Sequence, residues 1–215
     1  PQPAFDATSA TLFDFRTPQQ GALRFFYVLP MSPHRALVEY TVFSPKVLQQ
    51  PEYEAALRAY IQDVRGLRDY TIEQEENGAV PLTDYDFPRR IGRRVMSIGA
   101  KAGRVKPSTG YSLTRVQHDA EAIAQSLERH GHPFDVAPPS RWYDWLDTLL
   151  LDVLQHDGEQ LAGVFAALFQ RNTARRIFRF LDEEATLIEQ LPLIMSLPKG
   201  VFLRAVLRTL FEAQR

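Results

Sequence analysis

The pattern of hydrophobic and polar positions divides the chain into a mixed first part and a helical second part. Up to about Leu127, short aromatic and β-branched runs alternate with segments of helical period. Residues 131–133 and 138–139 then form a loop rich in glycine and proline, and apolar residues recur at helical spacing from Arg141 onward. We therefore expect strands and helices in the first part and helices alone in the second.

Two runs near the start of the chain predict a pair of strands. Residues 23–29 and 36–43 are rich in aromatic and β-branched side chains, and a short segment with two prolines separates them. A helix should follow, because Pro51 suits a first helical turn and apolar residues recur at one-face spacing as far as Val64. These elements together predict a hairpin followed by a helix.

A second hairpin and a strand–loop–helix unit are expected further along. Asn77-Gly78 is a strong hairpin turn, with alternating residues 69–76 before it and residues 79–83 after it. Residues 94–98 have the pattern of a short strand, which leads into a loop with three glycines and then a helix over residues 111–127. In α/β folds, strand, turn and helix in this order build phosphate and cofactor sites. The expected buried face of this helix comprises Val116, Ala120, Ile123, Ala124 and Leu127.

The last helix expected, over residues 201–211, is amphipathic. Arg204 and Arg208 lie on one side, and a row of apolar residues lies on the other. Such a helix can dock on a protein core or lie on a membrane surface, and the charge pattern allows both.

Composition excludes several classes of protein. The chain has 215 residues, 45% of them hydrophobic and 24% charged, values that exclude a wholly disordered or collagen-like chain. The absence of cysteine excludes a disulfide framework, a thiolate zinc site and a cysteine nucleophile. No apolar run approaches the ~18 residues that a membrane span needs. The net charge of −1 gives no overall attraction to nucleic acid or anionic lipid.

Glu39 is the first candidate for chemistry. The strand at residues 36–43 is apolar on both faces by alternation, so we expect it to be mostly buried, and Glu39 is its one charged residue. A carboxylate buried there costs several kcal/mol unless it is paired or protonated, and a buried carboxyl group near neutrality donates and accepts protons well. The alternatives are an ion pair with Arg35 or Arg24, or an edge strand with Glu39 in water.

A second candidate site is the loop from Gly99 to Tyr111. Its glycines let the backbone approach a ligand closely, and the start of the following helix favours an anionic oxygen. Residues 87–118 hold eight Lys or Arg and no Asp or Glu. Phosphate or reduced-flavin binding would explain this asymmetry, as would anionic lipid or nucleic acid. The plain alternative is a capped helix after an ordinary loop.

Other motifs are absent or weak. The five histidines show no metal-ligand spacing with nearby carboxylates, so no metal site is expected. The acidic run at residues 182–184 is typical of an exposed helix face. Ser108 lacks the Gly-x-Ser-x-Gly context of a hydrolase nucleophile, and the chain contains no Gly-x-Gly-x-x-Gly or P-loop motif.

These segments resemble a known family, the flavin-dependent lycopene cyclases. Residues 26–30 and 35–41 look like that family's strand pair, which has a Leu-Glu-Glu-Thr-like core, and residues 99–111 resemble its Gly-x-x-Ala-Gly-x-Val-x-Pro-Ser-Thr-Gly-Tyr segment. Phe13-Asp14-Phe15-Arg16 and Val80-Pro81-Leu82 fall in the expected order. The resemblance is strong over about residues 12–127 and loose after them.

The resemblance implies a mixed α+β fold like a piece of the flavoprotein hydroxylases. An antiparallel substrate-domain sheet would come first, in residues 1–88. One strand–loop–helix, residues 89–130, would return to the FAD domain, and an all-helical region, residues 141–215, would follow.

The reaction implied is a non-redox ring closure at the linear ends of lycopene or a related carotene. A proton adds to a terminal double bond, the neighbouring alkene attacks the tertiary cation, and loss of a proton fixes the ring's double bond. FAD is needed in its reduced form and is not consumed. A substrate that dissolves in lipid implies a cytoplasmic enzyme at the membrane surface, and no nucleic acid partner.

The resemblance assigns roles to particular residues. Glu39 carries over as the essential carboxylate. The cofactor-binding set is Gly99, Gly103, Pro107, Ser108, Thr109, Gly110 and Tyr111. Tyr27, Tyr40 and Tyr111 are candidates, by motif position alone, for stabilising a carbocation with their ring faces.

This sequence departs from the family's pattern in two places. The family's second glutamate is Tyr40 here, a replacement that alternation makes tolerable because residue 40 faces away from residue 39. The Gly-rich segment that would hold ADP lies upstream in the family and is missing from this sequence. The chain is therefore expected to be the C-terminal part of a cyclase, inactive alone.

Two other functions compete with this one. A flavin-dependent monooxygenase or other oxidoreductase of the same fold would consume NAD(P)H, and it has no need of a buried acid at Glu39. A non-catalytic basic module built on residues 87–118 would bind nucleic acid or anionic vesicles with an affinity that collapses in salt. The oligomeric state is not predicted.

Overall fold

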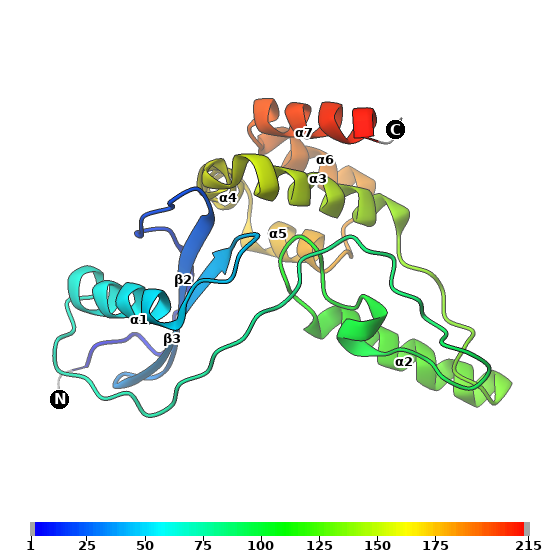
Figure 1. The fold of residues 1–215 in the computed structure, drawn as a ribbon, viewed down its shortest axis with the longest axis horizontal. Helices are drawn as coiled ribbons and strands as arrows, with labels where there is room; N and C mark the ends of the chain where they lie inside the picture. Colours follow the sequence, from blue (N-terminus) through cyan, green and yellow to red (C-terminus); the bar gives the residue numbers. More distant parts are fainter. Residues whose placement is uncertain (1–2, 213–215) are drawn as a thin grey trace. The chain divides into compact units, whose positions relative to one another are not determined.

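A computed structural model describes residues 3–212, and the chain divides into two compact units (Figure 1). The first unit contains Pro1–Ala79 together with Leu154–Ala167, and the second contains Val80–Val153 together with Leu168–Arg215. The division into residues 1–88, 89–130 and 141–215, which the resemblance implies, stays a prediction.

A three-stranded antiparallel sheet forms the centre of the first unit. Its strands are β1 (Thr11–Asp14), β2 (Leu23–Ser32) and β3 (Arg35–Phe43), in the order β1-β2-β3. The expected hairpin is confirmed as β2 and β3, whereas β1 was not predicted. β3 is an edge strand, and its pairing with β2 sets Tyr27 opposite Glu39 and Phe26 opposite Tyr40.

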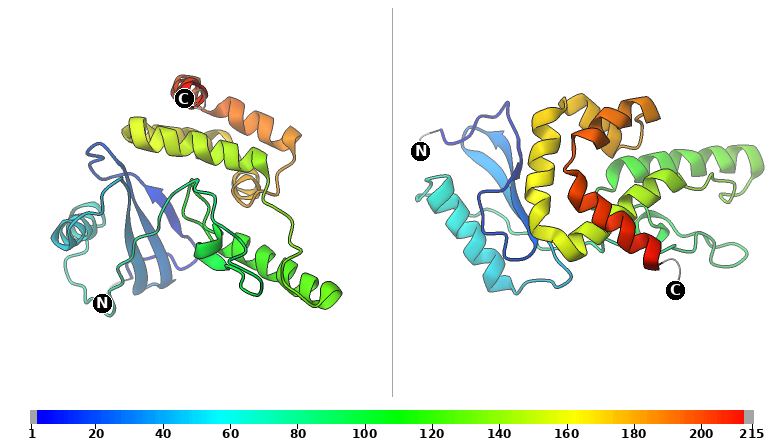
Figure 2. Two further views of the ribbon diagram at one scale, coloured as in Figure 1. Left: turned by 45° about the vertical axis from the view of Figure 1, so that its right-hand side comes forward. Right: turned by 90° about the horizontal axis from the view of Figure 1, so that it is seen from above.

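One face of this sheet is covered by the helix α1 (Gln50–Ala59), which continues as a π-helical turn, Tyr60–Val64. Figures 1 and 2 show α1 alongside β2 and β3. The ring of Phe26 stacks on Tyr60 at 3.9 Å between centroids and on Tyr40 at 4.7 Å. These rings and Val28 are buried, and apolar residues of α1 pack around them. The hairpin and this helix thus share one hydrophobic core.

A buried carboxylate ties β1 to this core. Asp14 accepts hydrogen bonds from the Tyr60 hydroxyl at 2.7 Å and from Arg16 Nη2 at 2.6 Å. The hydrogen bond from Arg16 outweighs burial and lowers the pKa of Asp14 to about 2. Burial, helped by the neighbouring carboxylate, raises the pKa of Tyr60 to about 12. The phenol therefore stays neutral and donates to Asp14 over a wide pH range.

Helices dominate the rest of the chain, as the sequence predicts from Arg141 onward. They are α2 (Leu113–His130), α3 (Arg141–Asp157), a short 3-10 turn (Gly158–Gln160), α4 (Leu161–Arg171), α5 (Ala174–Leu181), α6 (Leu187–Ser196) and α7 (Lys199–Glu212). The final expected helix, residues 201–211, lies within α7. Sheet and helices together confirm a mixed α+β chain.

Two expected strand regions are wrong. Among the described residues, 69–88 form no strand, and residues 94–98 contribute only an isolated bridge between Met96 and Arg90. The first region alternates but carries several acidic residues and little apolar surface to bury. In the second, Val95 and Ile98 are 55% and 65% exposed, so no neighbouring strand shelters them. A hairpin turn signal and a short apolar run do not make strands without a partner.

The burial of α2 is also the reverse of the expectation. Val116 and Leu127, on the predicted apolar face, are 36% and 48% exposed, while Asp119 and Ser126 are buried. Ion pairs and hydrogen bonds hold the polar face instead. Asp119 pairs with Arg89, and the Ser126 hydroxyl donates to the His132 carbonyl at 2.6 Å.

The Tyr60–Asp14 hydrogen bond predicts a loss of stability in alkali. Because the pKa of Tyr60 in the folded chain lies above its ordinary value of 10, its stabilising effect is fully present below pH 10 and is lost as the pH rises through about 12. We expect the free energy of unfolding in urea to fall by roughly 2 kcal/mol in this window from this residue. Tyr60→Phe should remove this share of the fall and lower stability at pH 7 by about 1 kcal/mol.

Tyr70→Phe is the matched control, since Tyr70 is 38% exposed in a segment without secondary structure. This variant should keep the alkaline fall of the parent chain. An equal fall for the parent chain and Tyr60→Phe would contradict the assignment.

Candidate functional site

Glu39 lies on the sheet face opposite to the one that α1 covers. Alternation and register place Phe25 and Tyr27 of β2 on this face, with Thr41 and Phe43 of β3. The ring of Phe25 lies 5.1 Å from Tyr27 and 5.7 Å from Phe43, edge-on in both cases. Glu39 therefore stands among aromatic neighbours on its own sheet face.

Two further elements extend this aromatic face. Phe13 of β1 lies 5.0 Å from Phe25 and 5.5 Å from Tyr27. Phe165 of α4 stacks on Phe13 at 5.2 Å, and Phe15 completes the group at 5.9 Å from Phe25. We call Phe13, Phe15, Phe25, Tyr27, Phe43 and Phe165 the aromatic face. Apart from Phe43, these residues are distant in sequence from Glu39, so only the folded structure reveals the aromatic face.

The expectation that Glu39 is buried is wrong for this chain. Its side chain is exposed, and Leu37 beside it is 42% exposed, because β3 is an edge strand packed on one face only. Arg35 pairs with Glu73 at 2.8 Å, and Arg24 donates to the Tyr40 hydroxyl, so neither ion pair considered for Glu39 forms. The alternative of an edge strand with Glu39 in water describes the structure.

A hydrogen bond nevertheless orients the Glu39 carboxylate. The hydroxyl of Thr41, two residues along the same face, donates to Glu39 Oε1 at 2.8 Å. This bond engages Oε1 and fixes the orientation of the carboxyl group. The resemblance did not assign Thr41 this role, although its position at i+2 on the strand could have indicated it.

The three candidate tyrosines separate in the structure. Tyr27 sits directly across from Glu39. Tyr40 points to the other face, into the core with Phe26 and Tyr60, so it cannot face a substrate beside Glu39. Tyr111 lies in the second unit and is 39% exposed.

The loop from Gly99 to Tyr111 is held by its own backbone. The N–H groups of Gly103 and Arg104 donate to the carbonyls of Ala100 and Gly99. Further along, the Lys106 carbonyl accepts from Gly110 at 2.8 Å, and the Lys106 N–H donates to the Tyr111 carbonyl at 2.7 Å. The prediction of a glycine-containing loop followed by a helix is confirmed for this segment.

All three glycines of the loop have a positive φ, that of Gly99 being +59°. Gly103 and Gly110 have φ of +68° and +77°, values that side chains rarely allow. At Gly103, an added Cβ would lie 3.2 Å from Phe87 Cδ2, whereas at Gly110 it would meet Leu82 at an ordinary 3.5 Å. Backbone conformation, rather than crowding, therefore accounts for Gly110.

The other candidate cofactor residues divide by exposure. Ser108 and Thr109 are buried, and Thr109 Oγ1 accepts a hydrogen bond from the Tyr111 N–H, so this hydroxyl serves the loop itself. Pro107 and Gly99 are partly accessible, as are Gly103 and Gly110. The helix α2 begins at Leu113, two residues later than expected, with Ser112 as its N-cap.

A cleft of about 370 Å³ opens at this helix start. It is lined by Lys106, Gly110, residues 111–115, Leu181 and Asp182. The backbone N–H groups of residues 113–115 precede the first helical hydrogen bond, which runs from Val116 to Ser112. A helix N-terminus favours negative charge on a ligand.

A buried ion network supports the floor of this cleft. Lys106 Nζ lies 3.0 Å from Asp147 Oδ1 and 2.8 Å from Glu183 Oε1. Arg115 Nη2 lies 3.1 Å from Asp147 Oδ2 and also contacts Glu183. Burial opposes the charge of Glu183, but Lys106 and Arg115 outweigh it and hold the pKa of that carboxyl below its usual range. Two cations and two carboxylates thus balance within one cluster.

Sequence reasoning missed this network. Asp147 and Glu183 lie 41 and 77 residues from Lys106, and no local pattern joins them. The acidic run 182–184 was expected to be an exposed helix face, yet Glu183 ends α5 with φ of +64° and a side chain only 19% exposed. The signal available was the excess of cations in residues 87–118, which required acidic partners from elsewhere.

The lining of this cleft is compatible with a flavin cofactor. A left-handed glycine, open backbone N–H groups and a helix N-terminus suit the electron-rich edge of a reduced flavin. Its size is enough for part of such a cofactor. Asp182, which accepts a hydrogen bond from Thr114 at 3.0 Å, is the one acidic group lining it. Among residues 3–212, no three His, Asp or Glu side chains converge as metal ligands.

Taken together, these features define a mixed α+β protein with an acid on an aromatic sheet face and a glycine-containing loop at a helix start. The model of the lycopene cyclase protein family matches residues 1–210, and the chain belongs to that family. No solved structure matches the chain.

The chain is similar to lycopene beta-cyclases from bacteria and plants. It is 32% identical over 111 residues to the enzyme of Pantoea ananas, an alignment that covers 49% of this chain and 28% of the relative. It is 34% identical over 125 residues to that of Pseudescherichia vulneris, covering 55% and 32%. For the chloroplastic/chromoplastic enzyme of Narcissus pseudonarcissus the identity is 31% over 107 residues, covering 49% and 21%. The chain therefore aligns with about a third or less of each relative's length.

Gly99 and Gly103, at the start and the end of the turn Gly99–Ala102, both have a positive φ. We nevertheless expect them to differ in their tolerance of an added methyl group. Gly99→Ala adds left-handed strain alone, because nothing lies within 4 Å of its Cβ position. It should lower the free energy of unfolding by about 1 kcal/mol. Gly103→Ala adds the Phe87 contact to similar strain and should cost roughly 2 kcal/mol. Thermal unfolding of both variants is the measurement, and equal losses would contradict the role of Phe87.

Proposed function

We propose that this chain carries the proton-transferring face of a flavin-dependent lycopene cyclase. Glu39 would be the acid, and the substrate would be lycopene or a related linear carotene. The observation that carries the proposal is the position of Glu39 beside the aromatic face, oriented by Thr41 and opposite Tyr27. Family membership supports the substrate class.

The reaction balances without any redox change. Glu39 gives its proton to a terminal double bond, and a tertiary cation forms. The neighbouring alkene attacks this cation and closes the ring, and loss of a proton from the ring restores a double bond. Ring faces such as that of Tyr27 stabilise the cation by up to ~2 kcal/mol each when they are desolvated.

The exposure of Glu39 fits a hydrocarbon substrate. A polyene lying on the aromatic face would itself exclude water from the carboxyl group, so desolvation would accompany binding. Desolvation disfavours the ionised form of a carboxyl group, so an acid that loses its water when substrate binds is held in its protonated, proton-donating form. The carboxyl needs no hydrogen bond from the substrate, which has none to offer.

FAD is the cofactor proposed for the cleft at the start of α2. When bound and reduced, a flavin supplies negative charge or acid–base chemistry without net electron transfer. In this chain, Gly110 and the following backbone would approach the cofactor closely, and the N-terminus of α2 would favour its negative charge. Lys106 and Arg115 would hold the loop in place through Asp147 and Glu183.

A peripheral position at the cytoplasmic face of a membrane is proposed for α6 and α7. No single described helix is long and apolar enough to span a membrane. Taken together, α6 and α7 have the length and composition for a span, but they are bent by 112° relative to each other. Large apolar side chains on both helices are half or more exposed: Leu187, Ile188, Leu191, Leu203, Leu210 and Phe211. Such a surface suits lipid contact and access to a lipid-dissolved carotene.

The two competing functions, an oxidoreductase and a basic binding module, are supported to different degrees. A monooxygenase or other oxidoreductase of this fold remains the alternative enzyme, and stoichiometric NAD(P)H consumption would distinguish it. A basic binding module is less favoured, because Lys106 and Arg115 are neutralised by carboxylates of the same unit.

Glu39→Gln should abolish cyclisation. The amide keeps the shape of the side chain but has no acidic proton, and general acids contribute roughly a hundredfold or more to rate. The complete reading frame containing this chain would be expressed in a lycopene-accumulating bacterium, with the pigments identified by chromatography. We expect lycopene to persist and the flavin spectrum of the purified variant to be unchanged.

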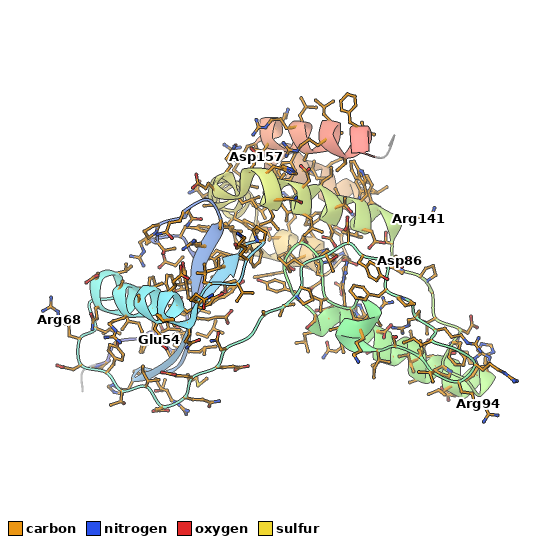
Figure 3. All side chains as sticks on the ribbon, viewed as in Figure 1. Glu54, Arg68, Asp86, Arg94, Arg141 and Asp157 are labelled. Atoms are coloured by element: carbon orange, nitrogen blue, oxygen red, sulfur yellow. The ribbon has the colours of Figure 1, made fainter. Side chains whose placement is uncertain are left out.

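Glu54→Gln provides the control, because Glu54 is an exposed glutamate on α1, on the far side of the sheet (Figure 3). It should form rings like the parent. Ring formation by Glu39→Gln would remove Glu39 from its role.

Fractionation of the same cells tests the membrane proposal: the parent protein should sediment with membranes, and substituting Ser at Leu203 and Leu207 should release it.

Thr41 is expected to position Glu39 rather than bind substrate. Thr41→Val keeps the shape but removes the hydrogen bond, so kcat should fall about tenfold while KM stays unchanged. Thr41→Ser should restore most of the rate. If Thr41→Val is fully active and Glu39→Gln is inactive, only the role of Thr41 is rejected. If Glu39→Gln is active, the proposed function itself is rejected.

A further inference from the structure

The structure sorts the eight cations of residues 87–118 by their partners. Lys106 and Arg115 are neutralised by Asp147 and Glu183. Arg90 donates to the carbonyls of Gly92 and Arg93 and lies over the Phe134 ring. Arg93, Arg94 and Lys101 are exposed, and Figure 3 shows the Arg94 side chain pointing outward. Only Arg89 and Arg104 remain, and both are largely buried.

Arg89 and Arg104 share a single carboxylate. Arg89 Nη2 lies 2.5 Å from Asp119 Oδ1, and Arg104 Nε lies 3.4 Å from the same oxygen. The side chains of the two arginines are 24% and 17% exposed, and that of Asp119 is 5% exposed. In direct contact, the group thus has two cations and one carboxylate in a place that water reaches poorly, and Asp144 adds a longer-range attraction to Arg104.

Several donors of this pair have no acceptor. Among the described residues, Arg89 Nε and Nη1 are buried without a hydrogen-bond partner, and Arg104 Nε has only its long contact with Asp119. Burial lowers the pKa of Arg104, and the attraction of Asp119 offsets this effect only in part. Unsatisfied buried donors and an unpaired buried charge are costly in a folded protein, so their presence calls for a ligand.

The surroundings indicate what kind of ligand fits. The Ser97 N–H donates to the Arg89 carbonyl at 2.8 Å, which joins Arg89 to the residues just before the turn Gly99–Ala102. Arg104 follows Gly103 directly, at the other end of this turn. Guanidinium groups present planar forks of donors that match the oxygens of a phosphate.

We propose that Arg89 and Arg104, held by Asp119, form a binding site for a phosphate group. The phosphate supplies the missing negative charge and accepts from the unpaired donors. This site is additional to the glycines and the cleft at the start of α2, and it stands whether or not Glu39 is the acid of a cyclase. A small molecule with a diphosphate is the ligand class, either free pyrophosphate or the diphosphate of a dinucleotide.

The test is calorimetric titration of this chain with inorganic pyrophosphate at low and high salt. We expect binding that weakens at least tenfold in Arg104→Met and in Arg89→Met. Arg94→Met is the matched control, because it removes an exposed cation from the same stretch and should bind like the parent. The proposal is overturned if the parent does not bind, if Arg104→Met binds as well as the parent, or if Arg94→Met weakens binding equally.

Thermal unfolding without phosphate separates a binding role from a structural one. If Arg104 is an uncompensated cation, Arg104→Met should melt at the same temperature as the parent or higher, and should lose the stabilisation that pyrophosphate gives. A lower melting temperature with pyrophosphate stabilisation retained would overturn the proposal. Should Arg104→Met fail to fold, Arg104→Lys keeps the charge without the fork and should still weaken binding severalfold.

Competition identifies the source of the phosphate. FAD that displaces pyrophosphate, with riboflavin inactive, supports the site and assigns it to a dinucleotide. Pyrophosphate binding that FAD does not disturb supports the site and assigns it to free phosphate. Displacement by riboflavin as strongly as by FAD would overturn the proposal, because riboflavin has no phosphate.

Discussion

The pairing of Lys106 and Arg115 with Asp147 and Glu183 is the constraint on which the second unit depends. Burying two cations is costly without acceptors, and here one carboxylate comes from α3 and one from just after α5. The backbone of Lys106 also closes the loop that ends at Tyr111. A single residue thus fixes both the loop and its place against two helices, and the cleft at the start of α2 follows from that arrangement.

In the first unit, the sheet keeps its two faces chemically separate. One face is filled by stacked rings around Phe26 and by α1, and it needs no further partner. The other gathers aromatic rings around Phe13 and Phe25 yet leaves Glu39 accessible. Stability and chemistry therefore use alternate residues of the same strands. This explains how Tyr40 can occupy the position of a family glutamate while Glu39 keeps its surroundings.

Much of this could be predicted from the sequence, but only where local patterns decide the outcome. The β2–β3 hairpin, α1 and the C-terminal helices follow from periodicity and from the prolines that bound them. The tight loop at residues 99–111 follows from its glycines. β1 is only four residues long, and it is held by pairing with β2 and by the hydrogen bond from Tyr60, 46 residues away, to Asp14. Similarly, the polar face of α2 is buried because Arg89 meets Asp119 across 30 residues.

The exposure of Glu39 is another property that the local sequence pattern does not determine. Alternation correctly placed Glu39 on an apolar strand, but burial depends on what packs on each face, and pattern alone does not say which face is covered. The strand that carries Glu39 was therefore predicted, while the surroundings of Glu39 came only from the three-dimensional register and its role stays a prediction. The glycines show the converse, since their positive φ values are a local property that sequence anticipates well.

The π-helical turn Tyr60–Val64 has a consequence for the geometry of the first unit. Its wider hydrogen bond, from the Arg65 N–H to the Tyr60 carbonyl, accommodates one more residue per turn than an α-helix would. Each such extra residue rotates everything after it by about 100° around the helix axis. The rotation of α1 about its axis relative to the sheet is therefore independent of the direction in which the chain leaves the helix. The π-helical turn sets that direction for residues 66–79.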